Sequence, residues 1–338
     1  MDDYSAWVGR SETREDVAAA APLAGLAALL DHDISPWAPG TVPPLAHWLY
    51  FLPTARQSAI GDDGHPRRDG AGLLPPVPLP RRMWAGSRIE FLAPIAVGAA
   101  LTRVTTIDAI KPKRGASGDL LFVTLRHDIT ADGVAAIREE QDIVFREPAT
   151  TAPAPTPAAA IEPEPADAVR SLSPDPVLLF RYSALTFNAH RIHYDRDYAQ
   201  RVEGYAGLVV HGPLIATLLM DHFLRTAPGA NPRRFSFRAE APLIDGAPFS
   251  TFALPAGAMG ARCPGARDDA RRCRIAGPGP SKSTHRDHLG ISPPPTLPIR
   301  KAGHAAADHD RLVRTDADGV GEDPHQPCRS ASRAIPFL

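Results

Sequence analysis

The feature that most constrains this chain is a stretch near its middle, residues 148–165, that is almost wholly Pro, Ala, Thr and Glu. Such a composition buries too little apolar surface to order itself, and its prolines favour an extended chain. It therefore divides the 338 residues into two parts that are each large enough for a domain. We expect an N-terminal domain at 1–147, a linker at 148–166 and a second domain from 167.

The first half predicts a helix followed by antiparallel strands. Thr13 and Asp16 have the spacing of a capping box, which predicts a helix over 13–30, and the aromatic run 46–51 predicts a short strand. A loop rich in Gly, Pro and Asp follows. Four strand-like runs come next, separated by turn signals: 88–92, 101–110, 120–128 and 137–145. A helix packed on a sheet that buries one face is an α+β domain.

The second half begins in a similar way, so we expect a second copy of the same α+β architecture. The expected elements are a short strand at 177–182, a helical turn at 196–203, an apolar helix at 212–223, and strands at 234–238 and 243–252. The two halves show no repeat at the level of individual residues.

The sequence changes character at about residue 253. From there to residue 338 it is dominated by Pro, Gly, Arg, His and Ala, and neither the strand period nor the helix period persists. One interpretation is a disordered tail, which this composition favours. The other is a translational frame change in a GC-rich gene, which we prefer because the break falls inside an expected strand. In both cases the second domain ends at 252 and its last strands are incomplete.

Charge and cysteine usage narrow the classes of function. The formal net charge is -1 and the isoelectric point is about 6.9, so no basic face for nucleic acid is expected. The chain starts Met1-Asp2-Asp3 and has no apolar run of the roughly 20 residues that cross a bilayer, so we expect a soluble, cytoplasmic protein. We expect no disulfide, metal site or cofactor, because the cysteines show neither close pairing nor ligand spacing. They are Cys263, Cys273 and Cys328.

Candidate chemistry concentrates between residues 182 and 214. Asn188, His190 and His193 stand at positions i, i+2 and i+5 after an expected strand, and Gly212 opens an apolar helix. A single histidine after a strand is more often a satisfied polar residue than a catalyst. The segment, however, resembles the catalytic region of the MaoC-like (R)-specific enoyl-CoA hydratases. At matching intervals, Asn188 falls on that family's catalytic Asp, His190 on its Asn and His193 on its catalytic His.

Asn188 and His190 thus differ from the family's Asp and Asn, and these differences are typical of a subfamily. The run from residue 182 to 195 looks like that of the double hot-dog, FAS1-like dehydratases and the related mesaconyl-C4-CoA (itaconyl-CoA) hydratases. The N-terminal half is similar to the same subfamily at 63–66, 74–76 and 80–86. The resemblance covers roughly residues 48–252. It implies a tandem hot-dog fold, in which an antiparallel sheet wraps a central helix in each half.

The resemblance implies a hydro-lyase that adds or removes water at the 2,3 double bond of a short acyl-CoA. Hydration needs a base for water, an acid for the α-carbon and donors for the enolate oxygen. His193 suits the base, because imidazole exchanges protons near neutral pH. Asn188 cannot take up a proton, so it would hold water or orient His193. The backbone N–H of Gly212, at a helix start, would bind the thioester oxygen.

The other polar residues of this region have two interpretations each. His190 either binds water or caps the loop, and His211 is expected to pack rather than react. Arg81 and Arg82 either bind CoA phosphates or a substrate carboxylate, or form a solvated basic pair. Asp195 is either solvated or begins the short helix, and it is not expected to be catalytic.

Two other functions stay open. A hot-dog thioesterase would hydrolyse the thioester instead of hydrating the alkene. An inactive homologue would result if the last strands are missing, because their loss exposes a helix face and a sheet edge. The expected partner is an acyl-CoA thioester, with mesaconyl-C4-CoA or itaconyl-CoA as the candidates that the resemblance suggests. Hot-dog domains commonly pair, and two copies can pair within one chain, so a monomer and a homodimer both stay open.

Overall fold

The computed structural model describes residues 3–33, 37–70, 72–115, 118–147, 169–239, 241–254, 258–262 and 273–276. The first half contains α1 (Ala20–Leu29) and the strands β1 (Ser11–Val17), β2 (Arg81–Phe91), β3 (Ala100–Gly115), β4 (Gly118–Ala131) and β5 (Val134–Arg146). The second half contains α2 (Pro176–Thr186), α3 (Arg196–Arg201), α4 (Gly212–Thr226) and the strands β6 (Val169–Leu172), β7 (Arg234–Arg238), β8 (Phe249–Leu254), β9 (Ala258–Arg262) and β10 (Cys273–Ala276). Short 3-10 turns are η1 (Ser5–Trp7), η2 (Ala46–Leu49), η3 (Gln57–Ala59) and η4 (Arg191–His193). The predicted linker, Cys263 and Cys328 lie outside the described residues.

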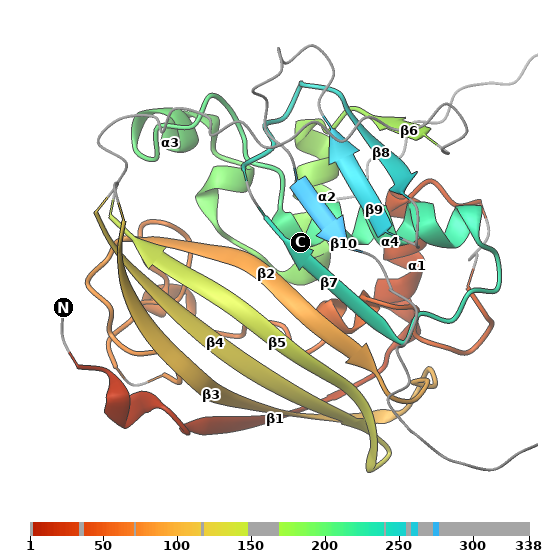
Figure 1. Ribbon diagram of the computed structural model, residues 1–338, viewed down its shortest axis with the longest axis horizontal. Helices are drawn as coiled ribbons and strands as arrows, with labels where there is room; N and C mark the ends of the chain where they lie inside the picture. Colours follow the sequence, from red (N-terminus) through yellow and green to blue (C-terminus); the bar gives the residue numbers. More distant parts are fainter. Residues whose placement is uncertain are drawn as a thin grey trace, which may run out of the picture. The chain divides into compact units, whose positions relative to one another are not determined.

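The strands form a ten-stranded sheet that repeats one topology twice (Figure 1). From its edge to the middle, the first half has the order β1-β3-β4-β5-β2, and the second half has β6-β8-β9-β10-β7. The predicted second copy of the architecture is therefore confirmed. β2 and β7 pair antiparallel where the halves meet. At this junction a Cβ on Gly86 would lie 2.3 Å from the carbonyl oxygen of Phe237, so the close approach of the two strands requires glycine.

The four strands predicted in the first half are confirmed as β2 to β5. In β4 buried and partly exposed side chains alternate through most of the strand, so one face packs inward. Asp132 and Gly133 both have positive φ values, 48° and 78°, as a two-residue hairpin turn requires. In the second half the apolar helix, the short helix and the strand at 234–238 are confirmed as α4, α3 and β7. Of the strand predicted at 243–252, only the end is part of β8.

The helix predicted over 13–30 is wrong in its first part. Residues 11–17 form β1, which pairs antiparallel with β3 so that Ser11 lies opposite Thr106. Exposure alternates along β1, and a neighbouring strand satisfies its backbone groups better than a side-chain cap would. The helix α1 starts only at Ala20. Pro22 then falls in the first turn, where its missing N–H has no intrahelical partner to lose.

Two predicted strands are helical instead. Residues 46–49 form the turn η2, and the segment 177–182 lies within α2. Asp175 caps α2 by accepting a hydrogen bond from the backbone N–H of Leu178 at 2.7 Å, and Pro176 occupies the first helical position. A short apolar run alone does not separate a buried strand from a helix. Here the cap and the proline decide for the helix.

Two strands lie beyond residue 252, where the second domain was predicted to end. β9 and β10 have 5 and 4 residues, whereas β3 and β4 have 16 and 14. The predicted boundary thus falls inside β8 and leaves out two strands of the sheet. Within the described residues both copies have five strands in the same order.

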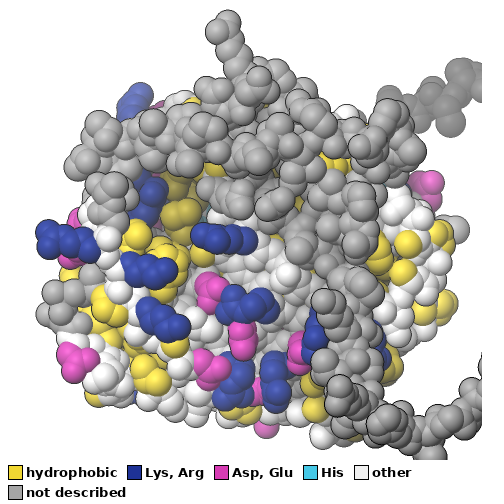
Figure 2. Space-filling view, viewed as in Figure 1, with side chains coloured by type: hydrophobic (Ala, Val, Ile, Leu, Met, Phe, Trp, Pro, Cys, Tyr) yellow, Lys and Arg dark blue, Asp and Glu magenta, His cyan; other side chains and the backbone are white. Residues whose placement is uncertain are grey.

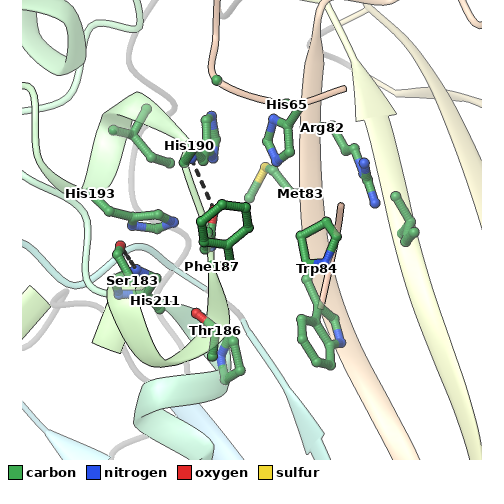
Figure 3. Close-up of a pocket in the computed structure, with 18 of the residues that line it drawn as sticks. His65, Arg82, Met83, Trp84, Ser183, Thr186, Phe187, His190, His193 and His211 are labelled. Carbon is green, nitrogen blue, oxygen red and sulfur yellow. Dashed lines mark hydrogen bonds between the residues drawn. The ribbon is translucent and has the colours of Figure 1, made fainter. Parts of the chain in front are cut away.

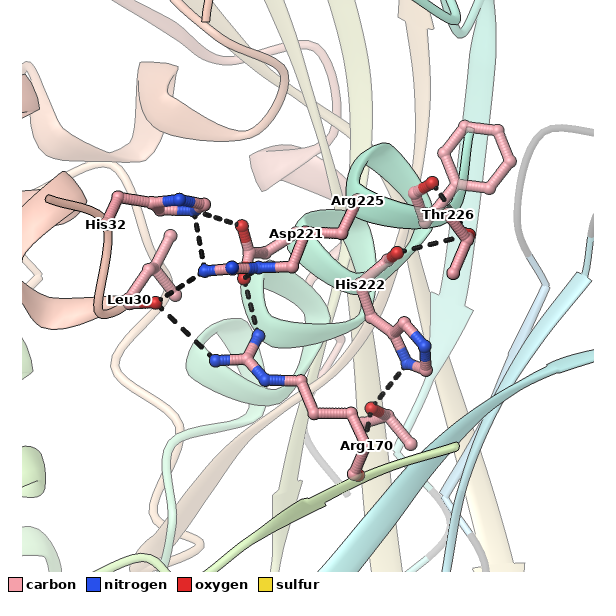
Figure 4. Close-up of polar contacts among 9 residues, drawn as sticks. Leu30, His32, Arg170, Asp221, His222, Arg225 and Thr226 are labelled. Atoms are coloured by element: carbon pink, nitrogen blue, oxygen red, sulfur yellow. Dashed lines mark hydrogen bonds and ion pairs between the residues drawn. The ribbon is translucent and has the colours of Figure 1, made fainter. Parts of the chain in front are cut away.

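A buried carboxylate fastens the helix α4 to both halves (Figure 4). The side chain of Asp221 is buried, and its oxygens lie 2.6 Å from Nη1 of Arg170, 2.9 Å from Nε of Arg225 and 2.6 Å from Nε2 of His32. Arg170 belongs to β6, and His32 follows α1. A buried charge is tolerated when it is fully paired in this way, and removing a partner is costly.

The sheet carries mixed charge on the side seen in Figure 2, where Lys and Arg alternate with Asp and Glu. Ion pairs such as Arg88 with Asp142 at 2.6 Å and Arg126 with Asp108 at 3.1 Å join neighbouring strands. Exposed pairs of this kind contribute little to stability. Among the helices that the structure describes, none is long and apolar enough to cross a membrane.

Candidate active site

A cavity of about 1990 Å³ is lined by residues of both halves (Figure 3). Every candidate residue from the sequence borders it: Asn188, His190, His193, Gly212, Arg81 and Arg82. The spacing of the motif thus corresponds to one place in the fold. The motif follows the helix α2, however, and not a strand as predicted.

The motif is shaped by the end of α2. Phe187 has a left-handed φ of 47° and ends the helix, and the N–H of Asn188 then donates to the carbonyl of Ser183 at 2.8 Å. The amide oxygen of Asn188 accepts from the backbone N–H of His190 at 3.0 Å. This tight turn leads directly into η4 and places His190 and His193 side by side in the cavity.

His193 is buried and is held by the backbone. Its Nδ1 lies 2.7 Å from the carbonyl oxygen of Val209. Because a carbonyl only accepts, Nδ1 carries the proton and Nε2 keeps a free lone pair. Burial lowers the pKa of His193 to about 4, so the ring is neutral at neutral pH. In the described part of the chain no hydrogen bond joins Asn188 to His193; the carbonyl of Val209 orients the ring of His193.

His211 packs against the ring of His193. The two rings stack with centroids 3.6 Å apart, and Nε2 of His211 lies 2.9 Å from Oγ of Ser183. Burial, and then the charge of His193, keep the pKa of His211 well below its ordinary value. A ring so enclosed packs and holds its neighbour, as the sequence predicted.

Gly212 lies at the N-terminus of the helix α4, directly after His211. The hydrogen bond from Ile215 to the carbonyl of His211 starts the helix, so the N–H of Gly212 has no intrahelical partner. The helix dipole adds partial positive charge at this end. A developing negative charge on an oxygen would be stabilised here.

A histidine from the other half, which the motif analysis passed over, completes the cluster. The ring of His65 lies 4.1 Å from that of His190, which in turn lies 5.4 Å from His193, so His190 stands between the other two (Figure 3). Nδ1 of His65 lies 3.1 Å from Oδ2 of Asp63. Burial and the charges of His65 and His193 lower the pKa of His190 to about 2, so His190 stays neutral. The Asp-Gly-His spacing was a local signal, but its position beside the motif is set by the fold.

Gly64 makes this approach of the two halves possible. Its φ is +88°, and a Cβ at this position would lie 1.8 Å from the carbonyl oxygen of Ala189. The N–H of Arg191 donates to the carbonyl of Asp63 at 2.9 Å, which ties the same two loops together. The loop 61–65 and the turn 188–191 therefore hold one another in place.

The two candidate arginines have different environments. Arg81 is paired, because its Nε lies 3.2 Å from Oε2 of Glu203 and its Nη2 donates to the carbonyl of the same residue at 2.6 Å. Arg82 has no carboxylate within ion-pair distance in the described ranges. Burial, and then the charge of Arg68, lower its pKa to about 10, so it remains a cation inside the cavity wall. A half-buried cation that lines a cavity and has no ion-pair partner among the described residues is suited to an anionic ligand.

Asp195 has one of the two roles that the sequence left open. Its Oδ1 accepts from the backbone N–H of Tyr198 at 3.0 Å and caps α3, and its other oxygen pairs with Arg191 at 2.6 Å. Asp195 therefore begins the short helix.

A second polar cluster lines the cavity from the first half, and no sequence motif pointed to it. The buried carboxylate of Glu139 accepts from Nε2 of His47 and Nε1 of Trp48, both at 3.0 Å, and from Oγ of Ser87 at 2.6 Å. Burial alone would raise the pKa of Glu139, but the hydrogen bond and charge of His47 lower it to about 2. The carboxylate of Glu139 therefore stays ionised.

The sequence comparisons give the family of the chain. Residues 45–245 match the model of a family described as hydroxyacyl-thioester dehydratase type 2. The chain is 51% identical over 262 residues to the mesaconyl-C(4)-CoA hydratase of Chloroflexus aurantiacus, which covers 75% of this chain and 90% of that protein.

The structural comparisons concern the fold. A MaoC-like dehydratase from Phytophthora capsici matches with a TM-score of 0.58 at 14% identity, over 82% of this chain and 97% of that one. A Mycobacterium tuberculosis protein described as having a double hot-dog fold matches with a TM-score of 0.50 at 16% identity, over 79% of this chain and 94% of that one. The predicted double hot-dog fold is therefore confirmed.

Proposed function

The chain belongs to the hydroxyacyl-thioester dehydratase type 2 family, and from that premise we propose that it hydrates the 2,3 double bond of a short, carboxylate-bearing acyl-CoA, or catalyses the reverse reaction. Membership makes the protein a hydro-lyase of acyl thioesters. The observation that carries the chemistry is the neutral His193, with Nε2 free, in the same cavity as the N-terminus of α4.

The residues divide the hydration step between them. Nε2 of His193 takes a proton from water as the water oxygen bonds to C3. The π electrons of the double bond move toward the thioester carbonyl, whose oxygen gains negative charge. The free N–H of Gly212 stabilises that charge, which is larger in the transition state than in the substrate. Protonation of C2 then restores the thioester carbonyl and completes the addition.

The substrate we propose is mesaconyl-C4-CoA or a close relative, from the 51% identity to a mesaconyl-C(4)-CoA hydratase. In this thioester the free carboxylate is attached to C3, the carbon that water attacks. A receptor for the carboxylate must therefore lie next to the catalytic histidines. Arg82 is suited to be this receptor because it lies near the histidines. Burial is the largest cause that lowers the pKa values of His65 and His190, and the charge of Arg82 lowers both further. Its guanidinium also lacks a carboxylate partner among the described residues.

A panel of thioesters tests the proposal. We expect loss of the enoyl absorbance of mesaconyl-C4-CoA without release of free thiol, and slower hydration of crotonyl-CoA, which has no carboxylate. Thiol release without hydration would assign the chain to the thioesterases. Absence of both reactions with mesaconyl-C4-CoA, itaconyl-CoA and crotonyl-CoA would favour the inactive homologue.

Location and assembly stay predictions. We propose a cytoplasmic enzyme, which cell fractionation would test. Between the two assemblies that the sequence left open, sedimentation velocity of the purified chain distinguishes a monomer from a homodimer.

A further inference from the structure

Hydration requires two proton transfers at two different atoms. The oxygen that adds to C3 loses a proton, and C2 gains one. Asn188 stands where the MaoC-like pattern has a catalytic Asp, and an amide does not exchange protons in this way. His211 is enclosed by its neighbours, and burial lowers the pKa of His190 to about 2, against about 4 for His193. His193 is therefore the strongest base with a free nitrogen that the motif itself offers.

The first half of the chain brings a second such group to the cavity. Nδ1 of His65 faces Oδ2 of Asp63 at 3.1 Å, so this nitrogen donates and Nε2 is the exchangeable position. The backbone N–H of His65 also donates to Oδ1 of the same carboxylate at 2.9 Å. The side chain of His65 is 22% exposed, borders the cavity, and lies on the far side of His190 from His193 (Figure 3).

Asp63 is suited to hold a proton on His65. Burial by itself would raise the pKa of Asp63, but the hydrogen bond and charge of His65 lower it to about 2, so the carboxylate stays ionised. An ionised carboxylate stabilises the imidazolium beside it. His193, by contrast, donates to a neutral carbonyl and has no such stabilisation. When one proton is shared between the two histidines, it therefore resides on His65.

We propose that His65 is a second catalytic residue of this site, which exchanges the proton at C2 while His193 serves the oxygen on C3, and that Asp63 is its positioning residue. The assignment rests on the proposed hydratase function.

Hydration starts from the form of the site that carries one proton. In this form His65 is the imidazolium, paired with Asp63, and His193 is neutral. His193 takes a proton from water as the C3–O bond forms and the π electrons move onto the thioester as an enolate. The Nε2 proton of His65 then passes to C2, the enolate electrons form the C–H bond, and the thioester carbonyl returns. His193 now holds the proton that His65 lost, and solvent exchange restores the starting state.

The electrostatics of the pair fit this division of work. Burial lowers the pKa of His193, the hydrogen bond to Val209 raises it, and the charge of His65 lowers it again, which disfavours a second proton on the site. Burial lowers the pKa of His65 below its ordinary value of 6.5 although Asp63 acts against it. A lower pKa makes the imidazolium a stronger acid, as protonation of carbon requires.

Exchange of the C2 protons separates the two histidines. The hydrated product of mesaconyl-C4-CoA is incubated with enzyme in D2O, deuterium uptake at C2 is followed by mass spectrometry, and dehydration is followed by absorbance. With His193→Gln we expect dehydration to fall by at least about 100-fold while exchange at C2 stays within a few-fold of wild type. With His65→Gln both rates should fall by at least about 100-fold.

Three further variants serve as controls and as independent tests of the roles of His65 and Asp63. His65→Asn keeps a donor toward Asp63 but cannot titrate, so it serves if the Gln variant does not fold, and it should lose exchange as well. Asp63→Asn should slow exchange, whereas Asp62→Asn, next to it on an exposed side chain, should leave exchange unchanged. Thermal melting of every variant is compared with wild type.

Two results would overturn the assignment. If folded His65→Gln or His65→Asn still exchanges the C2 protons at the wild-type rate, His65 does not serve C2. If His193→Gln loses exchange together with dehydration, one histidine serves both atoms. A wild-type chain that turns over none of the thioesters instead refutes the proposed function, and this assignment with it.

Discussion

Replacing Gly64 by Ala tests whether the contact between the two halves sets the geometry of the site. The added Cβ would lie 1.8 Å from the carbonyl oxygen of Ala189, and real Cβ atoms essentially never come within 3.0 Å of another atom, so the loops would have to part by about 1.2 Å. Ala189 adjoins His190, and the Gly64 loop carries His65. A displacement of about 1 Å in a catalytic group costs about 100-fold in rate. We therefore expect kcat/KM for hydration to fall by about 100-fold.

Stability should fall as well, for two separable reasons. A non-glycine residue at a φ of +88° costs about 1–2 kcal/mol. Parting the loops also weakens the hydrogen bond from Arg191 to the carbonyl of Asp63, which contributes about 1 kcal/mol. The unfolding free energy from urea denaturation should thus decrease by about 2–3 kcal/mol.

Gly98→Ala is the matched control. Gly98 has a φ of +92°, but a Cβ there would meet nothing within 4 Å. This variant should show the backbone cost of about 1–2 kcal/mol and keep wild-type activity. If Gly64→Ala is as active as Gly98→Ala, the contact between the loops does not hold the catalytic geometry, and the reasoning is wrong.

Five other outcomes are expected. His193→Ala should abolish turnover while a saturated acyl-CoA still binds in calorimetry. In the wild type, kcat/KM should fall as the pH decreases through about 4, because Nε2 of His193 becomes protonated. Arg82→Lys should raise KM about tenfold for mesaconyl-C4-CoA but not for crotonyl-CoA, with exposed Arg88→Lys unchanged for both. Asp221→Asn should lower the unfolding free energy in urea by about 3 kcal/mol, since its buried cations lose their counter-charge. Glu139 has a pKa of about 2 in the folded protein, against an ordinary value of 4.5. The ionised carboxylate therefore stabilises the fold fully above pH 4.5, and this stabilisation is lost as the pH falls toward 2. Glu139→Gln should flatten that part of the acid-denaturation curve.

The sequence alone determined the features that depend on neighbouring residues. The spacing of Asn188, His190 and His193 fixed their grouping in one cavity, because all of them lie within a single turn that leads into η4. The alternating runs of the first half likewise predicted β2 to β5, since a strand buries every second side chain. The helix that starts at Gly212 was likewise predicted from local sequence, because its residues form a largely apolar stretch.

Other features depend on partners far away in the chain, and only the tertiary structure decided them. Residues 11–17 are a strand because β3 lies beside them, although their own spacing suggested a helix. Neighbouring arginines differ because Glu203 reaches Arg81 and leaves Arg82 unpaired among the described residues. The free nitrogen of His193 follows from the carbonyl of Val209. Hydrogen bonds and charge pairs act over a few ångströms in space, so distance along the sequence does not reveal them.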